Sequence, residues 1–390
     1  MKGIRLGRLF GIEVDIHPSW FLALAFFAFT LARGFFPTAY PGWSPALVWA
    51  TAVVATLLLF ASVLAHEFGH SLVARSQGIP VRNITLFALG GVSQLAREPD
   101  SPGREAWMAI AGPLVSVVIG VVSLGAAYVL PGPQPVVAVL AYVGVANLAL
   151  VVFNLLPGFP LDGGRVLRAL LWRISHDVVR ATRHAAVVGQ VFAWGFIALG
   201  AAQLVLARGL GGVFLIFVGW LLIQAARATS RQTEMDHLLT GVTAARLMTT
   251  AESWLSPYTT LDWAAKDRLL DWETRCLPVA SEDPSAEYGG LMCVRDLQRT
   301  ANERSANDRV RDVMTPALRL PAVAPQTEAA DVLRLLRDGG ADRAVVVDEG
   351  GRLLGFIDAD AFVRFFTVAR TRRGSVSPSA HDGVTPPTAA

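Results

Sequence analysis

Six long apolar stretches constrain what this chain can fold into. Each approaches or exceeds the roughly 20 apolar residues that a helix needs to cross a bilayer. They are residues 19–36, 45–74, 107–130, 135–156, 186–207 and 210–226. Hydrophobic residues make up 53% of the chain and charged residues only 17%, against about 25% charged in an ordinary soluble domain. The sequence therefore predicts an all-α polytopic membrane core in a lipid bilayer and excludes a disordered or nucleic-acid-binding chain.

The connections between these stretches differ in positive charge, which indicates their orientation. The amino-terminal arm and the connections after the second and fourth stretches carry Lys2, Arg5, Arg8, Arg75, Arg82, Arg97, Arg104, Arg165, Arg168, Arg173, Arg180 and Arg183. The opposite connections carry only Arg33 and Arg208. Because loops rich in Lys and Arg stay on the cytoplasmic side, we expect a multi-pass protein of the cell membrane with both termini in the cytoplasm.

The strongest chemical motif is H-E-F-G-H at residues 66–70, near the end of the second stretch. Residues four apart share one face of a helix, so His66 and His70 can reach one metal ion with Glu67 beside them. Neutral imidazole nitrogens are good zinc ligands, and ionisable groups in a membrane helix usually have a function. The alternative is a polar patch at a helix end that binds no metal.

A catalytic zinc site needs a third protein ligand, and Asp162 is the best candidate. It lies in N-L-L-P-G-F-P-L-D-G-G, residues 154–164, where the fourth stretch ends. The second and fourth stretches end on the same side of the membrane, so the topology places Asp162 in the leaflet of the two histidines. The glycines that follow it allow close approach of the backbone. The alternative is that Asp162 only caps the helix that starts near Arg165.

Together, these two motifs resemble those of the site-2 protease family of intramembrane zinc metalloproteases. The resemblance covers residues 12–165 and includes A-G-P at 111–113 and H-P-S-W at 17–20. It implies one Zn²⁺ per chain held by His66, His70 and Asp162, a water activated by Glu67, and an oxyanion steadied by Asn154. The alternative role for Asn154 is an amide that holds two helices together.

The segment 84–95, I-T-L-F-A-L-G-G-V-S-Q-L, is too short and too glycine-rich to cross the membrane as a helix. We expect a small β-hairpin or re-entrant strand around its glycines. An unpaired strand edge can take up an extended peptide by strand addition, so the expected substrate-binding residues are Leu89, Gly90, Gly91 and Val92. The alternative is a surface hairpin without contact to substrate.

The carboxy-terminal third contains an internal repeat. R-L-M at 246–248 aligns with D-V-M at 312–314, and C-L-P-V at 276–279 aligns with R-A-V-V at 343–346. Each copy is expected to contain strands and helices in the order β-α-β-β-α, which resembles a cystathionine-β-synthase (CBS) domain pair. This resemblance implies ATP or AMP binding between the copies, with Asp296 holding the ribose. The alternative is a structural or dimerising pair without a nucleotide.

These observations predict a membrane metalloprotease domain (1–226), a linker (227–240), α/β CBS copies (241–305 and 306–367) and a disordered tail (368–390). The linker includes a polar segment at 230–240, and the tail is rich in Ser, Pro and Thr. Cys276 and Cys293 are the two cysteines, and no disulfide is expected.

The leading hypothesis is regulated intramembrane proteolysis by a zinc endopeptidase. The layout is similar to the bacterial subgroup with a C-terminal CBS module, which includes the protease that processes a membrane-tethered sporulation factor precursor. The resemblance implies a membrane-protein substrate, such as a tethered transcription factor precursor or an anti-sigma factor, and adenine-nucleotide gating. The alternatives are a CBS-regulated ion transporter or channel with a His/Asp metal site, and an inactive membrane scaffold.

Overall fold

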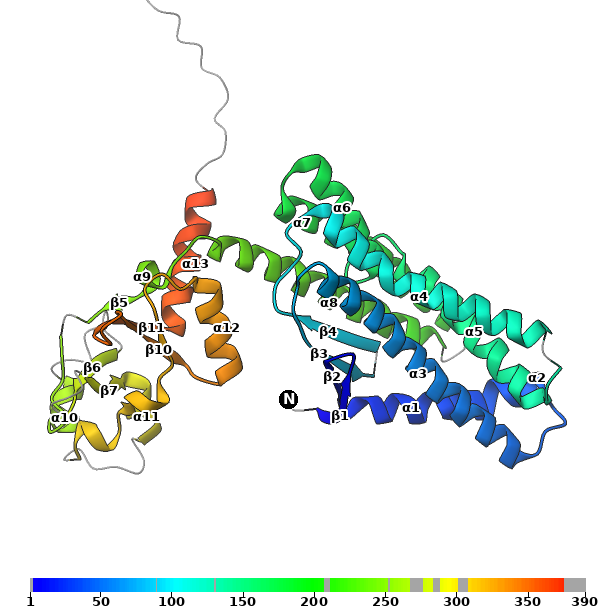
Figure 1. Cartoon of the computed structure of the whole chain (residues 1–390), viewed down its shortest axis with the longest axis horizontal. Coiled ribbons are helices and arrows are strands. Elements are labelled where there is room, and N and C mark those ends of the chain that lie inside the picture. The colour runs from blue at the N-terminus through cyan, green and yellow to red at the C-terminus, as the bar shows by residue number, and fades with distance from the viewer. Residues whose placement is uncertain are drawn as a thin grey trace, which may run out of the picture. The chain divides into compact units, whose positions relative to one another are not determined.

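The computed structural model describes residues 3–88, 90–129, 131–206, 211–251, 253–266, 276–282, 288–300 and 308–374. The chain forms two compact units, Met1–Thr233 and Glu234–Ala390. Figure 1 shows long helices and one small sheet in the first unit, and short strands and helices in the second.

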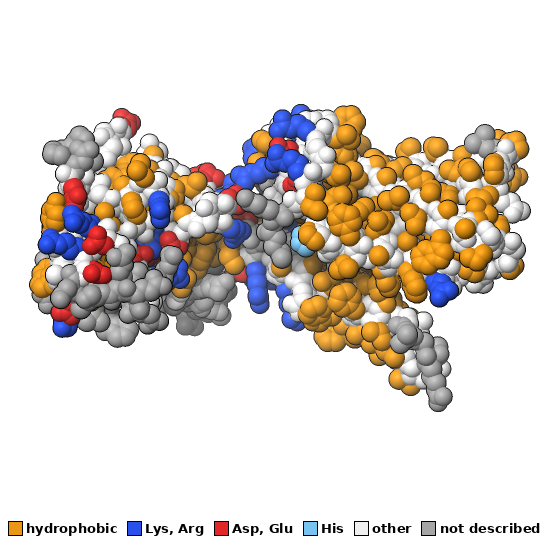
Figure 2. Space-filling view, turned by 90° about the horizontal axis from the view of Figure 1, so that it is seen from below, with side chains coloured by type: hydrophobic (Ala, Val, Ile, Leu, Met, Phe, Trp, Pro, Cys, Tyr) orange, Lys and Arg blue, Asp and Glu red, His pale blue; other side chains and the backbone are white. Residues whose placement is uncertain are grey.

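The described residues contain six helices that are long and apolar enough to cross a membrane, and all six begin in the first unit. The first combines α1 (Ser19–Thr30), a π-helical turn (Leu31–Phe35) and α2 (Phe36–Ala39), and the others are α3 (Pro45–Ser76), α4 (Pro102–Val129), α5 (Gln134–Asn154), α7 (Val178–Leu206) and α8 (Gly211–Leu239). Hydrophobic side chains cover much of the face of this unit seen in Figure 2. The predicted helical membrane core is confirmed.

Helices α3, α4 and α5 pack closely in the middle of this unit (Figure 1). Glycines allow the contact between α4 and α5, because a Cβ on Gly144 would lie 2.6 Å from Leu124 Cγ. A polar contact joins α3 to α5, where the Asn147 side-chain amide donates to Ser62 Oγ at 3.0 Å. These contacts fix the three helices that surround the predicted metal ligands.

A four-stranded sheet lies beside α3, in the order β1 (Ile4–Leu9), β2 (Ile12–Ile16), β3 (Val81–Phe87) and β4 (Gly90–Leu95). Strands β2 and β3 are parallel, and the other two pairs are antiparallel. The expected hairpin at 84–95 is present as β3 and β4. The two amino-terminal strands were not predicted, although Ile12, Val14 and Ile16 alternate with polar residues and are buried, which is the pattern of a half-buried strand.

After α5 the chain forms a tight loop and then α6 (Asp162–Ser175). Small residues hold this loop against α7, because a Cβ on Gly158 would lie 2.3 Å from Gly189 Cα. The Phe159 backbone amide donates to the Ala185 carbonyl at 3.2 Å. The loop therefore has a defined path, which places the first residue of α6.

The second unit contains two small sheets, in the orders β5-β11-β10-β9 and β6-β7-β8. Strand β5 of the first copy pairs with β11 of the second, and β8 of the second copy pairs with β7 of the first. The elements are α9 (Ala244–Leu247), β5 (Thr249–Thr250), α10 (Leu261–Ala264), β6 (Cys276–Ala280), β7 (Tyr288–Cys293), α11 (Val294–Thr300), two 3₁₀ turns (Val310–Asp312 and Ala317–Arg319), β8 (Thr315–Pro316), β9 (Ala322–Val323), α12 (Ala329–Gly339), β10 (Arg343–Val347), β11 (Leu353–Asp358) and α13 (Ala359–Gly374). The repeat seen in the sequence thus corresponds to a reciprocal exchange of short strands.

The structure corrects the prediction about the cysteines, because Cys276 and Cys293 form a disulfide. Antiparallel pairing of β6 with β7 sets the two residues opposite each other, with Cα atoms 4.0 Å apart. Contact between two cysteines 17 residues apart in the chain cannot be read from their number alone.

Two predicted segments differ from the structure or fall partly outside it. The expected linker at 227–240 continues α8 as far as Leu239. Helix α13 includes the start of the predicted tail, up to Gly374, and residues 375–390 lie outside the described residues.

Candidate metal centre

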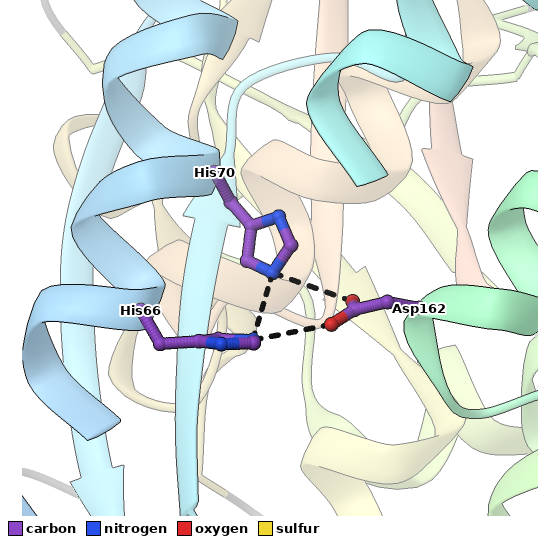
Figure 3. Close-up of side chains that lie close together, drawn as sticks. All are labelled: His66, His70 and Asp162. Atoms are coloured by element: carbon purple, nitrogen blue, oxygen red, sulfur yellow. Dashed lines mark hydrogen bonds and ion pairs between the residues drawn. The ribbon is translucent and has the colours of Figure 1, made fainter. Parts of the chain in front are cut away.

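His66 and His70 lie on one face of α3, as their spacing predicts, and their rings point toward Asp162 (Figure 3). The two Nε2 atoms are 3.2 Å apart. His66 is almost fully buried, at 3% exposed. Ligand atoms of these two residues and Asp162 all lie within 4.8 Å of one another.

Asp162 is the first residue of α6 and faces both imidazoles. Its Oδ2 lies 3.1 Å from His66 Nε2, and its Oδ1 lies 3.3 Å from His70 Nε2. The helix-capping position belongs to Leu161. The geometry therefore favours a ligand rather than a cap.

A stripe of three residues on α4, spaced four apart, supports the two imidazoles. His70 Nδ1 lies 2.7 Å from the Met108 carbonyl, and His66 Nδ1 lies 3.0 Å from Ser116 Oγ. Between them, Gly112 leaves room for the rings, because a Cβ there would lie 2.2 Å from His70 Nε2. A side chain at this position would fill the space that the imidazole tips occupy.

These contacts fit a divalent metal. A carbonyl can only accept, so His70 Nδ1 carries its proton and, in neutral His70, the Nε2 lone pair faces the other ligands. Two imidazole nitrogens and an ionised carboxylate then converge, and such electron-rich groups need a cation between them. Two imidazoles and one carboxylate form the ligand set of a catalytic zinc site, and outer contacts that fix the imidazoles are typical of metal centres.

Asn154 is the last residue of α5 and lies beside the same cluster. Its Nδ2 is 3.5 Å from His66 Nε2, so the side-chain amide is aimed at the space between the ligands. The structure thus brings Asn154 together with His66, His70 and Asp162, although 84 residues separate Asn154 from His70.

Glu67 faces β4 of the sheet. Its Oε2 accepts a hydrogen bond from Ser93 Oγ at 3.0 Å, and Ser93 Oγ is 3.0 Å from Ser71 Oγ. A Cβ on Gly91 would lie 2.4 Å from Glu67 Cγ, so the strand backbone passes close to the carboxylate. In the order of the sheet, β4 is a terminal strand. Gly90 and Val92 lie on the same strand, and Leu89 lies outside the described residues.

Asp296, the predicted ribose-binding residue, lies in the second unit and is 5% exposed. Its carboxylate forms a two-pronged ion pair with Arg343, with Nη1–Oδ2 and Nη2–Oδ1 distances of 2.7 and 3.0 Å. The Cys293 backbone amide donates to the same carboxylate at 2.9 Å. A ribose that bound here would have to displace Arg343.

Sequence reasoning did not assign roles to Met108, Gly112, Ser116 and Ser93. The first three lie four residues apart on one face of α4, and Gly112 belongs to the A-G-P segment at 111–113. That pattern, in a helix next to the histidine-bearing one, was the available signal. Ser93 gave no comparable signal, because its contact with Glu67 depends on how the sheet meets α3.

Comparison with known proteins reveals two families. The model of peptidase family M50 matches residues 54–136 and 133–197, and that of the CBS domain matches residues 310–367. Rip3 of Mycobacterium tuberculosis, named a zinc metalloprotease, is 34% identical over 94% of this chain and 93% of its own. The Synechocystis protein sll0528, named likewise, is 32% identical over 93% and 95%. The solved structure of a site-2 protease from Methanocaldococcus jannaschii has 31% identity and a TM-score of 0.41, covering 58% of this chain and 95% of that one.

Proposed function

Because the chain belongs to peptidase family M50, the zinc metalloprotease family of the site-2 proteases, we propose that it is an intramembrane endopeptidase. Its substrate would be a membrane-embedded or membrane-tethered protein, cut in or near its transmembrane segment. The observation that carries this proposal is the meeting of His66, His70 and Asp162 from α3 and α6, beside Glu67.

Each residue has a distinct role in this proposal. His66, His70 and Asp162 would hold the zinc ion, which lowers the pKa of water and polarises a carbonyl when bound. Glu67 accepts a proton from the attacking water and passes it to the leaving amine. Asn154 donates a hydrogen bond where negative charge develops, and such a donor is typically worth about 2.7–4 kcal/mol in hydrolases.

The terminal strand β4 would present the substrate to these groups. A helical transmembrane segment must unwind before its peptide bonds can be cut, and an exposed strand edge stabilises an extended peptide through backbone hydrogen bonds. The closeness of Gly91 to Glu67 supports this role, because a peptide paired with β4 would lie near the general base.

The decisive experiment replaces Glu67 by Gln in the full chain, co-expressed with a membrane-tethered transcription factor precursor or anti-sigma factor. We expect cleavage to be lost while metal content is retained, because the change removes the base but none of the ligands. Glu13→Gln, in β2, is the matched control and should cleave normally. Persistent cleavage by Glu67→Gln would refute the proposal, and metal-dependent ion flux that this variant preserves would favour a transporter.

We further propose that the protein lies in the cell membrane with both termini and the CBS pair in the cytoplasm. The twelve Lys and Arg residues on one set of connections support this orientation. Cysteine-accessibility labelling at the exposed Arg173 and at Gly42 would test it, since the two positions are expected on opposite sides. Equal labelling of both from outside intact cells would contradict it.

The proposal extends to regulation by the CBS pair, with ATP or AMP as the ligand and a homodimer as one arrangement of the pair. Asp296 already forms an ion pair with Arg343. Nucleotide binding there would therefore replace Arg343 by the ribose as the partner of the Asp296 carboxylate. Calorimetry of the full chain with ATP and with AMP tests this. No heat at millimolar nucleotide would contradict the nucleotide-gating proposal without affecting the protease proposal.

A further inference from the structure

Arg168 is a buried charge that the proposed chemistry does not use. It lies on α6, six residues after Asp162, and is 3% exposed. A buried charge is costly unless it is paired and hydrogen-bonded. Its presence close to the ligand cluster therefore calls for a role.

Three segments supply the partners of Arg168. Its Nε donates to Glu105 Oε1 at 2.5 Å, and its Nη2 contacts the same oxygen. Glu105 lies in the first turn of α4 and is fully buried. Arg168 Nη1 donates to Glu98 Oε2 at 3.2 Å, in the segment between β4 and α4. Its guanidinium carbon lies 5.3 Å from the centre of the Phe159 ring, in the loop before α6.

These three segments are the ones that define the metal site. Helix α4 carries the stripe that supports the imidazoles, the segment with Glu98 follows the proposed substrate strand, and the loop with Phe159 leads into Asp162. One planar guanidinium joins all three to α6, because its donors form a rigid fork. The position of Asp162 relative to the histidines therefore depends on this contact.

We propose that Arg168 is a positioning residue for the metal site: it holds α6 against α4 so that the Asp162 carboxylate meets both imidazoles. This inference rests on the proposed metal site. Replacing Arg168 would let α6 shift, and the three ligands would then no longer converge. Contacts made directly to a metal ligand typically change metal affinity by about 10–100-fold, and we expect a loss of this order when the helix that carries a ligand shifts.

The test is Co²⁺ binding by the purified full chain, followed through the visible absorption bands of the bound ion. We expect Arg168→Met to weaken Co²⁺ binding by about 10–100-fold and to alter the bands, since the ligand geometry changes. Arg168→Lys keeps the charge but not the fork, so its effect should be smaller. Arg173→Met, exposed on the same helix, is the matched control and should bind like the wild type.

A purely stabilising role would lower the melting temperature but leave the affinity of the folded protein unchanged, and that result would overturn the inference. If Arg168→Met does not fold, Co²⁺ affinity is measured on Glu105→Gln instead, because this change removes the buried charge that pairs with Arg168 and hardly alters the side-chain volume. Unchanged Co²⁺ affinity in folded Glu105→Gln would equally overturn it. Failure of the wild type to bind Co²⁺ would instead count against the proposed metal site itself.

Discussion

At the scale of single residues, the candidate metal centre depends on a glycine that leaves space as much as on the side chains that could bind the ion. His66 and His70 have the chemistry of metal ligands, but their rings fit only because Gly112 has no side chain. The Met108 carbonyl and the Ser116 hydroxyl then set the direction of the rings from the same helix. A motif that names the ligands therefore describes only part of the site.

Gly112→Ala should abolish tight metal binding. The added Cβ would lie 2.2 Å from His70 Nε2 and 2.7 Å from His66 Nε2, and the α4 contacts prevent both rings from moving aside. Co²⁺ titration should show at least the roughly tenfold loss typical of disturbed support around a ligand. Gly125→Ala is the control on the same helix, because a Cβ there would have no other atom within 4 Å. This variant should bind Co²⁺ normally. Equal affinities for the two variants would contradict this account.

Ser93→Ala should slow catalysis without loss of metal. Ser93 donates to Glu67, and a hydrogen bond to a charged group is worth about 1.5–3 kcal/mol, so kcat should fall by about 10-fold or more. KM and Co²⁺ affinity should stay close to the wild-type values, and Ser93→Thr should restore part of the rate. A change confined to KM would show that Ser93 acts on substrate rather than on the base.

At the scale of elements, the sheet is asymmetric. Its strand β4 lies against Glu67, whereas β1 forms the opposite edge and is exposed along its length. Only β4 therefore offers an edge at which an added peptide would lie near Glu67.

A photo-crosslinking residue at Val92 should capture the substrate. Val92 is 48% exposed on β4, and Leu6, 61% exposed on β1, provides the control on the opposite edge. In the Glu67→Gln background, which should retain uncut substrate, we expect crosslinks from position 92 and few from position 6. Crosslinks of equal yield would contradict substrate binding along β4.

At the scale of the whole molecule, the two units are stabilised in different ways. The first buries few charges, and Arg168 with Glu105 is the principal pair among its described residues. The second joins the two copies of its repeat through exchanged strands and through the buried Asp296–Arg343 pair. Loss of one unit's contacts should therefore leave the other folded.

Asp296→Asn should destabilise only the CBS unit. It leaves the buried Arg343 with Asp342 as its remaining carboxylate partner, and losing hydrogen bonds between charged groups typically costs about 1.5–3 kcal/mol. Thermal unfolding of the full chain should show an earlier transition for the CBS unit, with Co²⁺ binding unchanged. Replacing Asp296 and Arg343 together by Leu and Met should recover much of the loss. Weakened Co²⁺ binding in Asp296→Asn would contradict independence of the units.

Local patterns account for much of what could be predicted. Apolar length identified the membrane helices, and the four-residue spacing of His66 and His70 placed them on one face, because both features depend only on helix geometry. Strand β2 was missed because it is stabilised by pairing with β3, a distant segment of the chain, and β1 was missed because it pairs with β2 and is exposed along its length. The disulfide was missed because it depends on strand register across β6 and β7.

The sequence by itself determined the six membrane helices, the candidate ligands His66, His70 and Asp162, and the repeat in the second unit. Only the tertiary structure decided that Gly112 leaves room for the imidazole rings and that Ser93 contacts Glu67. It also decided that Arg343 forms an ion pair with Asp296 and that Arg168 joins α6 to α4. The physical reason is range: helix length and spacing are set by neighbours along the chain, whereas these contacts join residues that only packing brings together.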